Sequence, residues 1–241
     1  MLIKPMLELE QVNTYYGKSH VLFDVSLRVG RGEIVALLGR NGVGKTTTLC
    51  TIMGLTPPRS GKIIFKEKNI AGKKAHQIAM SGIGLVPEER WIFSNLTVHQ
   101  NLIMGIKPGR FGNMAKGDWT FDRAYELFPV LATRKNQKGE VISGGEKQML
   151  TIARTLMGNP ELILIDEPTE GLAPLIVDKV NEVIREINTK GSTVLLVEQK
   201  LPVCLGLAHR IYVLSKGQIK WTGLTEDLGK REDIRKDYLE V

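Results

Sequence analysis

The sequence predicts an α/β fold in which helices cover both faces of a parallel sheet. Residues 34–38 and 162–165 are short apolar runs without alternation, as expected of central strands that are buried on both sides. Residues 83–86 and 192–197 have the same pattern. The segments between these runs carry apolar residues at helical spacing. The clearest such stripe consists of Ile176, Val180, Val183, Ile184 and Ile187.

The N-terminal part of the chain has a different pattern. Apolar and polar residues alternate over 7–10 and 25–29, which is typical of half-exposed antiparallel strands, and residues 62–65 are a further candidate strand. From about residue 97 to residue 157 the pattern is helical with few strand signals, and a glycine-rich loop interrupts it at 105–117. We interpret residues 97–157 as a helical lobe inserted into the α/β core.

Length and composition are those of an ordinary globular protein. The chain has 241 residues, of which 42% are hydrophobic and 24% charged, so it can bury a sizeable core as one large domain or two small lobes. No apolar run approaches the ~18 residues that are needed to cross a bilayer. The first residues also lack the apolar stretch of a secretory signal. We therefore expect the protein in the cytoplasm.

Charge and cysteine content argue against a nucleic-acid-binding or lipid-binding protein and against a disulfide-stabilised or zinc-binding one. A net charge of +7 leaves open an anionic partner such as nucleic acid or a lipid surface. However, most basic residues are interspersed with acids and none are interleaved with aromatics, which favours a merely solvated basic surface. Cys50 and Cys204 lie far apart, without a Cys or His partner at metal-ligand spacing, so we expect neither a disulfide framework nor a zinc site.

A glycine-rich segment joins the first buried strand to a helix that begins near Lys45. Residues 39–46 match G-x-x-x-x-G-K-[ST] in the strand-loop-helix context that a phosphate-binding loop requires. Its backbone N–H groups and the helix N-terminus attract phosphate, Lys45 can reach the β- and γ-phosphates, and the Thr46 hydroxyl can ligate Mg²⁺. The alternative is a turn that binds nothing. The expected nucleotide contacts are Gly39, Arg40, Asn41, Gly42, Val43, Gly44, Lys45, Thr46 and Thr47.

Two acids stand where the apolar run 162–165 ends. Open α/β sheets bind their ligands at this end of the strands. We expect Asp166 to be the carboxylate associated with Mg²⁺ and Glu167 to be the base that orients or deprotonates the attacking water. The alternative is that the two acids only cap the strand end. The phosphate loop upstream favours the catalytic interpretation over this one.

Between these two motifs lies the segment Ile-Ser-Gly-Gly-Glu-Lys-Gln at 142–148, followed by a helical stripe. Ser143 is well placed as the N-cap of that helix. Taken alone, the segment indicates only a capped helix with a flexible lead. Its Gly144 and Gly145 backbone N–H groups, at a helix N-terminus, are nevertheless suited to a γ-phosphate.

Together these three motifs resemble the ATP-binding-cassette (ABC) ATPases, and the resemblance covers nearly the whole chain. In the family hallmark, usually written LSGGQ, this chain has Ile142 for leucine and Glu146 for glutamine. The resemblance implies a P-loop NTPase fold with a RecA-like parallel-sheet core, an N-terminal antiparallel β subdomain and an inserted helical lobe. It also implies a single nucleotide-binding domain over residues 1–241, with ATP and Mg²⁺ as cofactors.

The resemblance assigns roles to further residues. Tyr16 lies where the family stacks an aromatic ring on adenine, with a core tyrosine as the alternative. Glu88 occupies the Q-loop position, where its oxygen can bind Mg²⁺ or a water on it. Gln199 occupies the switch-histidine position, where we expect an amide contact to the γ-phosphate. Ala173 stands where many members have the D-loop aspartate. Glu88, Ala173 and Gln199 all depart from the usual family residues, which suggests slow turnover.

Four segments carry a finer resemblance, to the LivF-type ATPases of branched-chain amino-acid importers, with the ATPase of urea importers close behind. Glu89 and Glu170 fall at positions where that subgroup usually has other residues. The four segments are Val-Pro-Glu at 86–88, Ser-Gly-Gly-Glu at 143–146, Gly-Leu-Ala-Pro at 171–174 and Leu-Val-Glu-Gln at 196–199.

The family resemblance also implies partners. Two cassettes of this family close head to tail, so each ATP is expected between the phosphate loop of one and residues 143–146 of the other, which is either a second copy or a different chain. Integral-membrane permeases and, indirectly, a solute-binding protein are implied, with a peripheral location on the cytoplasmic face of the inner or plasma membrane. Residues 91–93 and Leu96 lie where the family receives a helix of the membrane subunit. The alternative for them is interior packing of the lobe.

Two other functions fit parts of the sequence. Cassettes that act on nucleic acid or ribosomes have two sets of motifs in one chain or a long coiled coil, whereas this chain has one set and no long heptad insert. We therefore expect no nucleic-acid partner. A second alternative, a P-loop kinase of small molecules, would leave the Ser-Gly-Gly-Glu segment at 143–146 without a role. The expected function is ATP hydrolysis that energises an importer.

Overall fold

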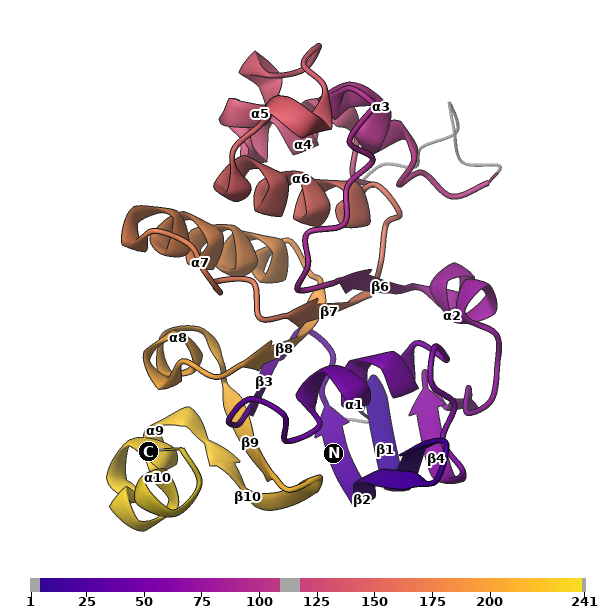
Figure 1. Ribbon diagram of the computed structural model, residues 1–241, viewed down its shortest axis with the longest axis vertical. Coiled ribbons are helices and arrows are strands. Elements are labelled where there is room, and N and C mark those ends of the chain that lie inside the picture. Colours follow the sequence, from indigo (N-terminus) through magenta and orange to yellow (C-terminus); the bar gives the residue numbers. More distant parts are fainter. Residues whose placement is uncertain (1–4, 109–117, 240–241) are drawn as a thin grey trace.

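The computed structural model describes residues 5–108 and 118–239. Part of the glycine-rich loop predicted at 105–117 lies outside this range. Two β-sheets form the body of the molecule, and the helices α3 to α6 gather at one end of it (Figure 1).

The N-terminal sheet is antiparallel, with the strand order β2-β1-β4-β5. Its strands β1 and β2 run as far as their shared turn, beyond the alternating segments 7–10 and 25–29, because register shifts within the hairpin break the strict alternation. The predicted strand at 62–65 lies within β4. The strands are β1 (Leu7–Tyr16), β2 (Ser19–Val29), β4 (Ser60–Phe65) and β5 (Lys68–Asn69).

The central sheet has the strand order β10-β9-β3-β8-β7-β6 and is parallel except for β10, which pairs antiparallel with β9. The four predicted buried strands are β3, β6, β7 and β8. The strands β9 and β10 were not predicted from the sequence. The bounds are β3 (Ile34–Leu38), β6 (Ile83–Val86), β7 (Leu162–Asp166), β8 (Thr193–Glu198), β9 (Arg210–Ser215) and β10 (Gln218–Leu224).

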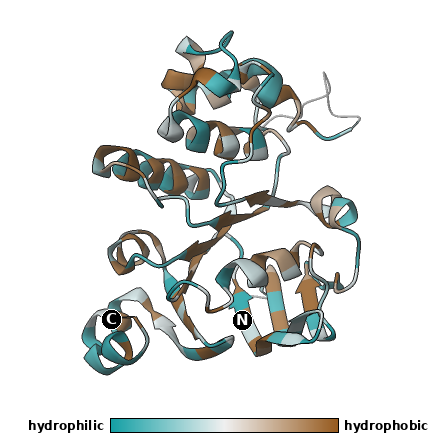
Figure 2. Cartoon of the chain, viewed as in Figure 1, coloured by the Kyte–Doolittle hydropathy of each residue, from teal (hydrophilic) through white to brown (hydrophobic). Residues whose placement is uncertain are grey.

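The unbroken apolar runs arise because both faces of the central sheet are covered. In β3, Ala36 and Leu38 belong to one hydrophobic core, while Val35 and Leu37 belong to another. The first core includes α7, α8 and the helices of the lobe, and the second includes α1 and the N-terminal sheet. Every residue of β3, β7 and β8 is buried, and Figure 2 shows these strands as mainly hydrophobic.

Short helices surround the two sheets, and only α6 and α7 are longer than eight residues among those of the described ranges. The lobe contains α3 (Val98–Ile103), α4 (Phe121–Leu127), α5 (Pro129–Thr133), a 3₁₀ turn (Gly139–Val141) and α6 (Gly144–Leu156). The others are α1 (Lys45–Ile52), α2 (Ala75–Ser81), α7 (Pro174–Thr189), α8 (Leu201–Leu207), α9 (Thr225–Lys230) and α10 (Glu232–Tyr238). Within residues 5–108 and 118–239, none of these helices has the length and apolar character that a bilayer crossing requires.

The register of the parallel strands brings the predicted motifs to one edge of the sheet. Leu38 pairs with Glu198, and Asp166 pairs with Val197. The chain segments that follow β3, β7 and β8 therefore leave the sheet side by side. These segments are the phosphate loop, the acidic pair and the loop of Gln199, and the segment of Glu88 follows β6 on the same side, because Val86 pairs with Ile165.

Candidate nucleotide site

The phosphate loop occupies the turn between β3 and α1. Gly39 begins it, and a Cβ at this position would lie 2.4 Å from the Leu214 carbonyl oxygen, so only glycine fits. Gly44 precedes α1 with φ of 108°, in the left-handed region that other residues avoid. No side chain caps α1 and no acid lies in its first turn. The N–H groups at this end of α1 are therefore available to an anion.

Lys45 is buried and holds two partners. Its Nζ lies 2.9 Å from Glu167 Oε1, and it donates to the Arg40 carbonyl oxygen at 2.9 Å. The Lys45 and Glu167 side chains are only 3% and 7% exposed. The predicted phosphate ligand and the predicted base thus form an ion pair with each other. Glu167 has φ of 39°, so its backbone turns sharply where β7 ends.

Asp166 has the chemical character of a cation ligand. It is 3% exposed, and its Oδ1 has no hydrogen-bond partner within the described part of the chain. Burial raises the pKa of its carboxyl to about 6, an interaction with Thr46 opposes that shift, and the charges of Glu167 and Glu88 add to it. A buried, unsatisfied carboxylate oxygen beside a threonine is the arrangement that a bound cation would compensate.

A cavity of about 330 Å³ joins the phosphate loop to the acids. Partial desolvation and the charges of Glu167 and Glu89 raise the pKa of Glu88, which lines the cavity. The lining residues are Val21, Asn41, Gly42, Gly44, Lys45, Thr46, Thr47, Glu88, Glu167 and Glu170. Glu170 was not predicted as a site residue, although its position three residues after the predicted base in a turn could have indicated it. No group of three His, Cys, Asp or Glu side chains suited to a metal occurs in the described ranges.

Gln199 contacts the same acidic loop from the neighbouring strand. Its Nε2 donates to Glu170 Oε2 at 3.0 Å, and its backbone N–H donates to Glu198 Oε2 at 3.1 Å. It lines a second hollow of about 420 Å³ together with Gly39, Arg40 and Asn41 of the phosphate loop. Asn41 lines both cavities. The structure therefore places Gln199 beside the phosphate loop.

Tyr16 stands at the end of β1, and its side chain is 50% exposed. The alternative of a core tyrosine is therefore wrong. Tyr16 does not line the cavity of the phosphate loop, which Val21 of the adjacent strand does line. Its stacking on adenine stays a prediction.

The Ser143 segment forms the N-terminus of α6. Ser143 Oγ accepts from the Glu146 N–H at 3.3 Å, and Glu146 Oε2 accepts from the Ser143 N–H at 2.7 Å, which makes a reciprocal capping box. Arg134 Nε donates to Glu146 Oε1 at 3.1 Å. Burial alone would raise the pKa of Glu146, but these hydrogen bonds bring it below its ordinary value. Ser143 is thus an N-cap, as predicted.

The structure does not bring residues 143–146 into the phosphate-loop cavity of the same chain. Ser143, Gly145 and Glu146 line a different pocket, of about 400 Å³, between α6 and α7. In Figure 1 the N-terminal end of α6 belongs to the helical end of the molecule, whereas α1 lies among the sheets. The two sets of predicted γ-phosphate donors are separate within one chain.

Known proteins resemble this chain over nearly its whole length. A protein-family profile described as ABC transporter matches residues 22–170. The chain is 43% identical over 234 residues to the high-affinity branched-chain amino acid transport ATP-binding protein BraG of Pseudomonas aeruginosa, which covers 97% of this chain and 99% of that protein. It is 35% identical over 234 residues to the lipopolysaccharide export system ATP-binding protein LptB of Haemophilus influenzae, with 97% of each chain covered.

A solved structure gives the same result for the fold. The ADP conformation of MJ1267, an ATP-binding cassette of an ABC transporter, matches with a TM-score of 0.80 at 27% identity, covering 97% of this chain and 96% of that chain. The predicted α/β fold, with its antiparallel N-terminal sheet and largely parallel core, is confirmed. The chain belongs to the ABC transporter family, as one of its ATP-binding, ATP-hydrolysing cassettes.

Proposed function

We propose that the chain is the ATPase subunit of an ABC importer, with branched-chain amino acids as its transported solutes. The observation that carries this proposal is the 43% identity to BraG across 97% of the chain. The four segments of the finer resemblance support it, because they occur together with a complete phosphate loop and acidic strand end. We further propose that residues 1–241 act as one nucleotide-binding domain, with 97–157 as its helical lobe.

ATP binding begins with an exchange of partners at Lys45. In the free protein its ammonium group pairs with Glu167. A triphosphate in the cavity attracts the same ammonium group, while the N–H groups at the start of α1 receive phosphate oxygens. The exchange leaves the Glu167 carboxylate free to accept a proton from the attacking water. The nucleotide thereby prepares its own hydrolysis.

Mg²⁺ fits the residues at this site. Thr46, Asp166 and Glu88 would hold it, and the unsatisfied Oδ1 of Asp166 is the observation that supports the assignment. Mg²⁺ typically takes one or two protein carboxylates and completes its shell with phosphate oxygens and water. When bound, it neutralises charge on the β- and γ-phosphates. The chain's own contribution is to hold the oxygens of Thr46 and Glu88 at the cavity wall, with the buried carboxylate of Asp166 next to Thr46.

The remaining site residues act on the two ends of the nucleotide. Tyr16 stacks on the adenine, and Gln199 contacts the γ-phosphate through its amide. Residues 143–146 of a second cassette complete the site, since those of the same chain lie in another pocket. That second cassette is a copy of this chain or a related one. ATP then holds the two cassettes together, and its hydrolysis releases them.

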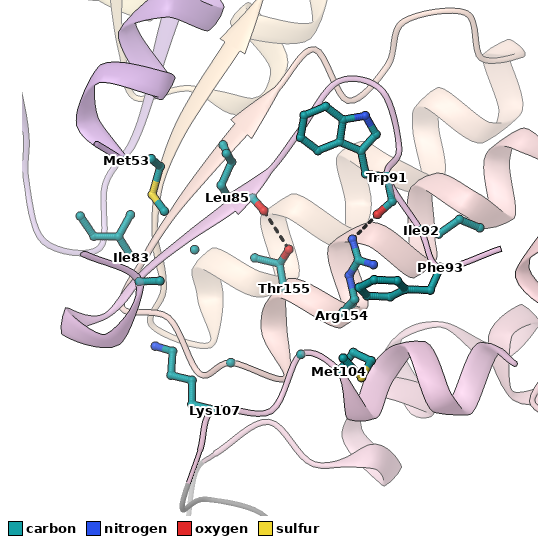
Figure 3. A pocket seen from close by; sticks show the side chains of 14 residues that line it. Met53, Ile83, Leu85, Trp91, Ile92, Phe93, Met104, Lys107, Arg154 and Thr155 are labelled. Carbon is teal, nitrogen blue, oxygen red and sulfur yellow. Dashed lines mark hydrogen bonds between the residues drawn. The ribbon is translucent and has the colours of Figure 1, made fainter. Parts of the chain in front are cut away.

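A groove of about 600 Å³ supports docking onto a membrane permease (Figure 3). Trp91 and Phe93 line it and are 62% and 47% exposed, so interior packing does not account for these two side chains. Arg154 of α6 donates to the Trp91 carbonyl oxygen and lies over the Phe93 ring, 5.2 Å from its centroid. Thr155 donates to the Leu85 carbonyl oxygen at 3.1 Å.

These contacts join the groove to two elements that lead to the nucleotide. Helix α6 begins at the Ser143 segment, and β6 leads to Glu88. We therefore propose that a helix of the permease occupies the groove and that the chain is peripheral, on the cytoplasmic face of the membrane. A solute-binding protein would act on the other side. No nucleic-acid partner is proposed.

The transported solute is tested by uptake in cells that lack this chain. Wild-type chain should restore uptake of labelled leucine, and the variant Lys45→Ala should not. Labelled urea serves as the second solute, because the sequence also resembles the urea-importer ATPase. The 35% identity to LptB makes lipopolysaccharide export the second candidate. Normal leucine uptake with a defect in urea uptake, or in lipopolysaccharide at the cell surface, would overturn the amino-acid assignment.

A further inference from the structure

We propose that Glu170 is a positioning residue for ATP hydrolysis, whose carboxylate fixes the amide of Gln199 in one orientation. The inference rests on the proposed function, because it assumes that Gln199 contacts the γ-phosphate. Gln199 Nε2 donates a hydrogen bond to Glu170 Oε2 at 3.0 Å.

The chemistry of the pair determines which end of the amide faces Glu170. An ionised carboxylate only accepts hydrogen bonds, so the NH₂ group of Gln199 has to point toward it and the amide oxygen has to point away. A neutral glutamine without such a neighbour can exchange its nitrogen and oxygen by rotation about its last bond. Glu170 therefore selects one of the two orientations of the Gln199 amide.

Glu170 is itself well held. Its N–H donates to the Glu167 carbonyl oxygen at 3.1 Å, so the two acids belong to one tight turn. Its carbonyl oxygen accepts from Arg90, whose Nε also donates to Gln148 Oε1 of α6 at 3.2 Å. Lys200 Nζ lies 3.8 Å from Glu170 Oε2. The carboxylate thus has a fixed backbone and a neighbouring cation.

The fixed amide leaves two groups for the reaction. One N–H of Gln199 bonds Glu170, so the second N–H is available to a γ-phosphate oxygen, and Oε1 is available to one hydrogen of the attacking water. The water oxygen bonds to the γ-phosphorus and its other proton goes to Glu167. The bond from the γ-phosphorus to the bridging oxygen breaks, and ADP leaves with the electron pair. A flipped amide would place its oxygen against the γ-phosphate oxygens, where the contact is repulsive, and would direct an N–H at the lone pair of the water oxygen that has to attack phosphorus.

The variants Glu170→Gln and Glu170→Ala test the proposal in the full chain, tagged and purified from its own cells together with the subunits that it binds. Glu170→Gln keeps the size of the side chain but can pair with either end of the Gln199 amide. Both variants should lower kcat about tenfold, the effect expected of one lost hydrogen bond, with little change in the KM for ATP. Glu170→Asp should retain part of the rate. Glu170 is 44% exposed, so its loss should leave the melting temperature nearly unchanged.

The control is Glu186→Gln on α7, a carboxylate of similar exposure that pairs with Lys190 away from the cavity and should keep the wild-type kcat. In a Gln199→Ala background, Glu170→Gln should have no further effect, because a positioning residue acts only through the group it positions. A wild-type or higher kcat for Glu170→Gln, or a full further loss in the Gln199→Ala background, would overturn the inference.

A different result would contradict the proposed function itself. Lys45→Ala and Glu167→Gln should each remove the ATPase activity of this chain. If they do so while Glu170→Gln hydrolyses ATP as the wild type does, only the positioning role is wrong. If Lys45→Ala also hydrolyses ATP normally, the nucleotide site itself is wrong, and the role of Glu170 is overturned with it.

Discussion

Lys45 and Glu167 form an ion pair in which both side chains are buried, with Nζ 2.9 Å from Oε1. Under the proposed function one of them binds phosphate and the other is the base. The free protein therefore keeps its two central charges neutralised by each other, and a nucleotide separates them. Burial makes this arrangement sensitive to the removal of either partner, because the charge that is left has little access to water.

Glu167→Gln should slow ATP hydrolysis by roughly 10² to 10⁴ while nucleotide binding is retained. The amide is nearly the same size as the carboxylate but cannot accept the proton of water. Phosphate release at saturating ATP gives the rate, and titration with a fluorescent ATP analogue gives the affinity. Unchanged turnover in this variant would exclude Glu167 as the base.

Lys45→Ala should abolish nucleotide binding and should also lower the melting temperature of the nucleotide-free protein. The second effect is expected because a buried carboxyl that loses its cation typically costs about 3–5 kcal/mol. The double variant Lys45→Ala/Glu167→Ala removes both charges and should recover part of the melting temperature without recovering binding. Equal melting temperatures for the single and double variants would show that the unpaired carboxylate does not cause the loss.

Much of the site could be predicted from the sequence because its elements are local. The loop at 39–46, the acids after β7 and the cap at Ser143 each depend on neighbouring residues, and the strand register then brings the first two together. The Lys45–Glu167 and Glu170–Gln199 contacts are different. They join side chains that are distant in sequence, so no local pattern indicates them.

The fold could be predicted wherever an unbroken apolar run indicates a strand that is buried on both faces of the sheet. The strands β3, β6, β7 and β8 were predicted, because each contains an apolar run and polar residues stand only at the ends of β7 and β8. By contrast, β10 is an edge strand whose residues alternate between exposed and half-buried, and it carries Gly223 and several polar residues. Its partner β9 has polar residues at both ends, which shorten its apolar run to four residues. Neither strand gave a distinct signal beside the helical patterns.

Glu146→Gln should remove a pH-dependent part of the stability of α6. The folded pKa of Glu146 is below its ordinary value, so its ionised form stabilises the protein above the unfolded pKa, and this stabilisation is lost as the pH falls through the folded pKa. Glutamine keeps the hydrogen bond to the Ser143 N–H without the charge. The difference in melting temperature between wild type and variant should therefore be largest near pH 7 and shrink below about pH 4. A difference that does not vary with pH would contradict this assignment.

Ser143→Arg should spare ATP binding and abolish hydrolysis that depends on a second cassette. Ser143 does not line the cavity at the phosphate loop. A large side chain at position 143 therefore leaves the chain's own phosphate loop unobstructed. In a closed pair of cassettes, the same side chain would occupy the space of the γ-phosphate. Nucleotide titration and the rate of phosphate release separate the two effects.

Ser143→Ala is the matched control, because it also removes the cap of α6 but adds no bulk. It should lower stability by about 1 kcal/mol, the usual effect of a lost N-cap, and it should retain far more activity than Ser143→Arg. If Ser143→Arg hydrolysed ATP at the wild-type rate, the Ser143 segment of a second cassette would not form part of the site. The separation of residues 143–146 from the phosphate loop would then need another explanation.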